Sequence, residues 1–563
     1  MKHFFKQNWL YLLIITALVI LSILSVGTFR YGFFTAYDEA YFLLKLQEAY
    51  DMSVITGKSQ WNLIAVHWFP YLDLTSKVSS YLASSILVWA TILVIATTAA
   101  IVYDKTKFFK YLAVTYLVYF PFGGGLSYVP MQTAVLAWAL CAFMLFYYSS
   151  RTWTKALFAA ICGVCLGLAC FIIIPAALVL LLCVAVLIGI LYWSDKRWML
   201  TCWAAGICGV LLAVAYMHFV VCDIREVIDA MRFAAGYIGK SGYRYDGLSF
   251  LVQYGLFARD CIFVLLAFTG AYALSSRLNN KYLAALAYIA LIGIYYHYQV
   301  KPQVYPSMFL SSVVLIPFLF SNRCHITWDT FRNRNTWLYL FLFAFPLVAP
   351  LGTNCALGGR VACFVAGWLF LLFGREYVHP TENWKRVTVA ALLLYCLPLV
   401  NVVKAYSQRD DTYHFTRGNK YFAELAIEER QKVYLDKVYD ILEQYNYTPH
   451  QSVVFTAVFD YCCLYAFDAV NATNFHQIEN FHYFDKSAML QPDFIFLCKW
   501  DSIVVADELR QMPWGWPEDF DVYYVGTPED ESSPFVNNPE MERRKLYCRK
   551  KNSMTNRIGT FSR

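Results

Sequence analysis

The chain has 563 residues, of which 59% are hydrophobic, 18% aromatic and 15% charged, and its formal net charge is +7. Soluble domains carry roughly 25% charged residues, so this composition excludes an ordinary water-soluble protein. It does not indicate a nucleic-acid partner either, because the basic residues lie at the ends of apolar runs and form no continuous basic face.

Long uncharged runs recur through residues 1–405. A helix of about 20 apolar residues crosses the hydrocarbon core of a bilayer while satisfying its own backbone hydrogen bonds. We therefore predict a polytopic α-helical membrane domain with thirteen transmembrane helices, the first of them a retained anchor rather than a cleaved signal. The predicted spans are residues 9–28, 81–102, 111–122, 131–149, 156–172, 174–193, 198–221, 261–276, 282–297, 304–320, 336–350, 361–374 and 387–403.

The loops between these spans differ in charge. Those on the side of the N-terminus hold more Lys and Arg than the opposite loops, although the opposite loops are about twice as long in total. The positive-inside rule then places the N-terminus in the cytoplasm and the loop 29–80 outside. Because the number of predicted spans is odd, residues 406–563 also lie on the extracytoplasmic side.

Residues 406–563 differ from the rest, because charge density rises and apolar runs shrink to strand length. A helical pattern precedes these runs, from about residue 423 to 444. We predict a small extracytoplasmic α/β domain, with strands at 452–455, 494–497, 503–505 and 522–525. In an oxidising compartment its cysteines allow one disulfide, whose pairing the spacing does not determine. These cysteines are Cys462, Cys463, Cys498 and Cys548.

Two adjacent carboxylates, Asp38 and Glu39, follow the first predicted span. Thr35 suits the N-cap position, so a helix is expected to begin here. Its apolar residues would let it lie along the membrane surface. They are Leu43, Leu44, Leu46 and Tyr50. A purely structural explanation of the acidic pair stands beside a catalytic one, because acids in a first turn favour the positive end of the helix dipole.

The whole pattern resembles the GT-C superfamily of membrane glycosyltransferases. It is most similar to the protein O-mannosyltransferases and to the bacterial transferases that put aminoarabinose on lipid A. Asp38-Glu39-Ala40-Tyr41 matches their acidic motif in kind and in place, at the start of the first outer loop. The resemblance implies an inverting enzyme that moves a sugar from a polyprenyl-phosphate or pyrophosphate donor. The acceptor would be a lipid, glycan or protein on the extracytoplasmic side, and the membrane a bacterial inner membrane.

The resemblance also implies roles for the acidic pair. Asp38 would take the proton of the acceptor hydroxyl as the new bond forms. Glu39 would be its partner or, together with Asp38, would bind a divalent cation such as Mg²⁺ or Mn²⁺. Metal-dependent relatives place a further acid in the second outer loop, whereas residues 121–130 contain none.

The leaving phosphate needs cationic donors, because negative charge develops on it during transfer. The outer-face candidates are Lys240, Arg244, Lys301 and Arg360. Each could equally be a basic residue that only extends to the bilayer edge. Substrate-lining candidates are Tyr41, His67 and Asn354. For His67 an interfacial hydrogen bond is the competing interpretation, and for Arg259 and Asp260 we expect a local ion pair.

Two other classes of protein share the polytopic architecture. A transporter or flippase would show paired halves and interrupted helices at corresponding positions, and neither pattern is visible in the sequence. A non-catalytic scaffold of envelope assembly would leave the acidic pair without a chemical role. An assay of sugar transfer with Asp38 variants separates the enzyme from both.

Overall fold

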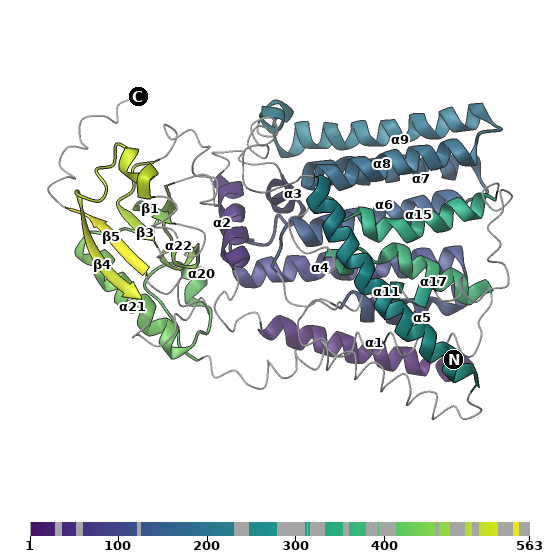
Figure 1. The fold of residues 1–563 in the computed structure, drawn as a ribbon, viewed down its shortest axis with the longest axis horizontal. Coiled ribbons are helices and arrows are strands. Elements are labelled where there is room, and N and C mark those ends of the chain that lie inside the picture. Colours follow the sequence, from purple (N-terminus) through teal and green to yellow (C-terminus); the bar gives the residue numbers. More distant parts are fainter. Residues whose placement is uncertain are drawn as a thin grey trace.

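The structure is a computed structural model. It describes residues 2–28, 37–51, 60–120, 125–229, 247–277, 310–311, 313–315, 333–352, 360–378, 392, 412–456, 461–472, 490–497, 506–526 and 544–550. Its two parts are a bundle of long helices and a smaller domain built on a β-sheet, with the short helix α2 (Tyr37–Asp51) between them (Figure 1).

The helices of the bundle run alongside one another, except that α11 crosses the others obliquely (Figure 1). They are α1 (Lys2–Thr28), α4 (Lys77–Val102), α5 (Phe108–Val118), α6 (Tyr128–Tyr148), α7 (Thr152–Ile172), α8 (Ile174–Leu191), α9 (Lys196–Tyr216), α11 (Gly247–Arg277), α15 (Arg334–Val348) and α17 (Ala366–Val378). Short elements extend or join them: the 3-10 turns η1 (Lys105–Lys107) and η3 (Ala362–Phe364), and the π-helix η2 (Met217–Val221) at the end of α9.

Six helices among the described residues are long and apolar enough to cross a membrane. They coincide with the predicted spans in α1, α4 and α6 to α9, and they make this an integral membrane protein. The shorter α5, α15 and α17, and part of α11, occupy four further predicted spans. The predictions at 282–297, 304–320 and 387–403 lie almost entirely outside the described residues, so the number thirteen stays a prediction. Sidedness also stays a prediction.

Helices α7 and α9 pack backbone against backbone. A Cβ atom added to Gly163 would lie 2.1 Å from the carbonyl oxygen of Gly206, and one added to Gly209 would lie 2.0 Å from that of Ala160. Glycine is therefore required at both positions. Small residues allow this close approach in membranes, where association depends on van der Waals packing rather than on the exclusion of water.

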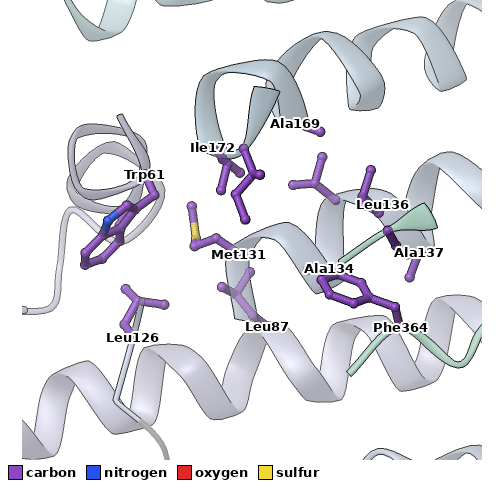
Figure 2. Close-up of a cluster of buried hydrophobic side chains, with 14 of the residues drawn as sticks. Trp61, Leu87, Leu126, Met131, Ala134, Leu136, Ala137, Ala169, Ile172 and Phe364 are labelled. Atoms are coloured by element: carbon purple, nitrogen blue, oxygen red, sulfur yellow. The ribbon is translucent and has the colours of Figure 1, made fainter. Parts of the chain in front are cut away.

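The bundle has an apolar core to which several helices contribute. Trp61 comes from α3 (Trp61–Trp68), Leu87 from α4, Met131 from α6 and Ile172 from α7, and Phe364 of η3 reaches the same cluster (Figure 2). All of them are almost completely buried. The loop before α3 is fixed to α7 as well, because the amide of Gln60 donates to the carbonyl of Phe171 at 2.8 Å.

The smaller domain contains a five-stranded sheet in the order β2-β1-β3-β5-β4. Its strands are β1 (Val453–Thr456), β2 (Val470–Asn471), β3 (Phe494–Leu497), β4 (Phe520–Gly526) and β5 (Arg544–Arg549). β1 pairs parallel with β2 and β3, whereas β5 pairs antiparallel with β3 and β4. Its helices are α20 (Lys420–Ala423), α21 (Glu429–Gln444) and α22 (Tyr461–Phe467).

The α/β prediction for this region is therefore confirmed, with strands at three of the four predicted runs. The run 503–505 and the expected boundary at residue 406 lie outside the described residues. Cys463 and Cys548 are buried thiols outside any disulfide, and burial raises the pKa of the Cys548 thiol. Nothing is described of Cys498 or of the Cys462 side chain, so a bridge between those two stays a prediction.

Candidate functional site

The acidic pair lies where the sequence places it, in the first turn of a helix. α2 begins at Tyr37, directly before Asp38 and Glu39. The side chains of these two residues are outside the description, so their chemical roles stay predictions.

The apolar side of α2 is covered by protein rather than by lipid. Ala40, Leu43, Leu44 and Leu46 are buried, and α2 packs on α3 and on α22 of the smaller domain. The prediction that this side lies along the membrane surface is therefore wrong. The hydrophobic pattern showed correctly that one side is covered, but a pattern of residues does not specify what covers it.

Phe42 connects α2 to two other segments of the chain. Its ring lies edge-on to that of Trp61 in α3, at 5.7 Å between centroids, and to that of Tyr128 at the start of α6, at 5.9 Å. Tyr41 is half-buried beside it, with its ring 5.3 Å from that of Phe42. Aromatic edge contacts of this kind fix ring orientation as well as burying area.

Arg360 reaches the same aromatic group. Its Nη2 donates a hydrogen bond to the hydroxyl of Tyr128 at 3.2 Å, and its guanidinium carbon lies 5.6 Å from the centre of that ring. The two bonded residues are 232 positions apart in the sequence. We call Phe42, Trp61, Tyr128 and Arg360 the Phe42–Arg360 cluster. It joins the helix that carries the acidic pair to one of the predicted phosphate-binding cations.

The other predicted site residues have different outcomes. His67 bonds through Nδ1 to the carbonyl oxygen of Leu63 at 2.9 Å within α3, which agrees with its structural interpretation. Arg259 and Asp260 form the expected local ion pair, at 2.8 Å. The remaining candidates lie outside the described residues: Lys240, Arg244, Lys301 and Asn354.

A metal site is not visible in the described part of the chain. No three side chains of His, Cys, Asp or Glu come together there. Because the carboxylates of Asp38 and Glu39 are not among the described side chains, binding of Mg²⁺ or Mn²⁺ by this pair stays a prediction.

Sequence reasoning missed a group of polar contacts between the loop before α4 and the smaller domain. Asp73 accepts hydrogen bonds from the amide of Thr75 at 3.2 Å and from its hydroxyl at 2.6 Å, and the hydroxyl of Tyr421 also donates to it. The hydroxyl of Tyr465 donates to the carbonyl oxygen of Thr75 at 2.6 Å. An Asp two residues before a Thr is a local turn signal, but neither tyrosine partner is local.

These contacts set the charge state of Asp73. Partial burial alone would raise the pKa of this carboxyl, but the hydrogen bonds from Thr75 and Tyr421 and the charge of Lys420 outweigh it. The pKa of Asp73 is therefore lowered from its usual value, and the group is an acceptor at neutral pH.

A second missed feature is a buried amide inside α6. Gln132 is fully buried, and within the part of the chain that the structure describes neither atom of its amide has a hydrogen-bond partner. It lies one helical turn beyond Tyr128. The sequence could have indicated it as a polar residue within a predicted span, a position at which unpaired amides are costly.

Comparison with solved structures identifies a chain of similar fold. No family model matches the chain, and no curated protein matches it. Over 96% of its length it is similar to ArnT from Cupriavidus metallidurans bound to undecaprenyl phosphate, with 98% of that chain covered, 12% identity and a TM-score of 0.44. A likeness of this degree assigns neither residues nor substrates.

Proposed function

We propose that this protein is a GT-C-type membrane glycosyltransferase. It would transfer a sugar from a polyprenyl-phosphate or pyrophosphate donor to a lipid, glycan or protein acceptor on the extracytoplasmic side. One observation supports this most directly: the Phe42–Arg360 cluster brings the helix of the acidic pair and a predicted phosphate-binding cation to the same tyrosine, Tyr128.

Helical register relates position 38 to this cluster. Residue 38 precedes Phe42 by four positions, so both lie on the same side of α2. A sugar acceptor becomes a competent nucleophile only when a positioned base takes its hydroxyl proton. Asp38 is the residue proposed for that role.

Arg360 is the residue proposed to bind the leaving phosphate. A guanidinium presents several donors in a planar fork that matches phosphate oxygens, and its charge stabilises the negative charge that develops on them. The hydroxyl of Tyr128 holds this guanidinium in place without neutralising it. The half-buried rings of Tyr128, which lies beside the cation, and of its neighbour Phe42 provide an apolar surface, as an isoprenoid chain would need.

The test uses the full-length protein in lipid nanodiscs with a panel of undecaprenyl-phosphate- and undecaprenyl-pyrophosphate-linked sugars. Transfer and donor hydrolysis are measured for wild type, Asp38→Asn, Asp38→Ala and Arg360→Ala. Loss of a general base lowers rates by roughly 10²- to 10⁴-fold, so we expect both Asp38 variants to lose transfer at wild-type stability. Arg360→Ala should weaken binding of undecaprenyl phosphate and slow transfer.

Arg259→Ala is the matched control. Arg259 is an exposed arginine that we predict to lie at the same membrane face, and it pairs with its neighbour Asp260, so its removal should leave transfer unchanged. Equal activity of Asp38→Ala and wild type would refute the proposal. Turnover of none of these donors, combined with solute uptake driven by an ion gradient, would establish a transporter instead.

Metal dependence is decided in the same assay. Transfer is measured with EDTA and again after addition of Mg²⁺ or Mn²⁺. Loss that either ion restores assigns Glu39 to an ion site with Asp38, whereas unchanged rates assign Glu39 to support of Asp38.

A further inference from the structure

The helix of the acidic pair depends on its neighbours for its position. α2 has 15 residues, and isolated helices of about this length are marginally stable in water. It packs on one side against α3 and on another against α22, a helix of the smaller domain. Figure 1 shows α2 between the bundle and that domain. A shift of α22 would therefore change the surface on which α2 rests.

α22 is fixed to the membrane domain by a buried tyrosine. Tyr465 is fully buried, and its hydroxyl donates to the carbonyl oxygen of Thr75 at 2.6 Å. Burial raises the pKa of this hydroxyl well above its usual value, so it remains a donor. Thr75 lies two residues before α4, a membrane-spanning helix. The bond thus ties α22 to a rigid element of the bundle.

Tyr421 makes a second tie to the same turn. Its hydroxyl donates to Asp73, and Asp73 in turn accepts from Thr75. Within the smaller domain, the segment before Tyr421 is held close to α22. The amide of Asn419 donates to the carbonyl of Ala466 at 2.9 Å, and a Cβ atom on Gly418 would lie 2.2 Å from that same oxygen. The two tyrosines therefore act on one connected unit.

We propose that Tyr465 and Tyr421 are positioning residues, through which the smaller domain holds α2, and with it Asp38, in the orientation that transfer requires. This inference rests on the proposed function. The phosphate-binding candidate Arg360 bonds to Tyr128, a residue of the bundle. Loosening the two tyrosine bonds should therefore slow the chemical step and leave binding of the donor phosphate nearly unchanged.

The experiment compares Tyr465→Phe and Tyr421→Phe with Tyr445→Phe in the full-length protein. Tyr445 is a matched control, because its hydroxyl donates to the carboxylate of Asp521 in β4 at 2.7 Å, a bond inside the smaller domain that does not involve α22. Three quantities are measured: hydrogen exchange of the amides of residues 40–51, the affinity for undecaprenyl phosphate, and kcat with the donor that wild type uses best.

Loss of one such hydrogen bond changes an equilibrium by roughly threefold to tenfold. For Tyr465→Phe and Tyr421→Phe we expect hydrogen exchange in α2 to rise and kcat to fall by that amount. Affinity for undecaprenyl phosphate should stay within twofold of wild type, which is roughly the scatter expected for a contact that does not reach the phosphate. Tyr445→Phe should leave exchange in α2 and kcat at wild-type values.

Exchange in α2 equal to that of Tyr445→Phe, or a loss of affinity as large as the loss of kcat, would overturn the positioning role. If wild type transfers no sugar from any donor, the proposed function fails. The exchange measurement then still decides whether the two tyrosines hold α2.

Discussion

Gly209→Ala tests the close packing of α7 on α9. The added methyl carbon would lie 2.0 Å from the carbonyl oxygen of Ala160 and 2.9 Å from the amide nitrogen of Val164. Ordinary contact begins near 3.4 Å, so the two helices must separate locally by about 1 Å or more. Both neighbours are backbone atoms, which do not move aside as a side chain can. Overpacking of this kind costs about 1–3 kcal/mol, and we expect a loss near the upper end.

Gly206→Ala is the control on the same helix. There the nearest atom to the new methyl carbon, the carbonyl oxygen of Ala159, lies 3.8 Å away. The substitution fits, and the better helix propensity of alanine should make the protein equal in stability or more stable by up to about 1 kcal/mol. Thermal unfolding of both variants is measured in one detergent by tryptophan fluorescence. Equal stability of the two would refute the backbone contact between α7 and α9.

The effect should extend to function. α9 continues into η2, which contacts α3, and α3 provides Trp61 to the Phe42–Arg360 cluster. We therefore expect Gly209→Ala, but not Gly206→Ala, to slow sugar transfer even at temperatures where both variants are folded.

Three further predictions concern single side chains. The pKa of Asp73 is lowered, so its bond from Tyr421 of the smaller domain is complete above the usual value of 3.8 and is lost as the pH falls through the lower folded-state value. Asp73→Asn should abolish this dependence, which is measured as protease cleavage of the smaller domain against pH. Gln132→Met should stabilise the protein by about 1–2 kcal/mol in thermal unfolding, because the amide has no described partner; a loss would reveal an internal water or ligand. Arg549→Met should cost about 3 kcal/mol and expose the smaller domain to trypsin, because the guanidinium donates to the carbonyls of Pro492 and Trp514.

Local signals in the sequence identified much of the fold. The strand β3, Phe494–Leu497, agrees with its apolar run residue for residue, and all four of its residues are buried. β5 was not predicted, because Arg544, Lys545 and Arg549 give it the composition of an exposed segment. The structure buries both arginines, and the carbonyls that bind Arg549 lie 35 and 57 residues away in the chain. A local pattern cannot contain such partners.

The same limit applies to the candidate site. The acidic pair and Arg360 could be selected by residue type and position. The capping signal at Thr35 predicted a helix in this region, and the structure has one that begins at Tyr37. The link between the acidic pair and Arg360 could not be predicted, because it passes through Phe42 and Tyr128, two aromatic residues in a chain that is 18% aromatic. The bond of Tyr465 could not be predicted either, because its partner Thr75 is 390 positions away in the sequence.

The place of β5 in the sheet bears on how the domain is made. β5 is the last of the five strands along the chain, yet it lies between β3 and β4. A nascent chain that has been translated only as far as β4 would leave both of these strands with an open edge, ready to pair wrongly. The last strand must therefore be synthesised before the sheet can close, and until then the open edges of β3 and β4 need protection from wrong pairing.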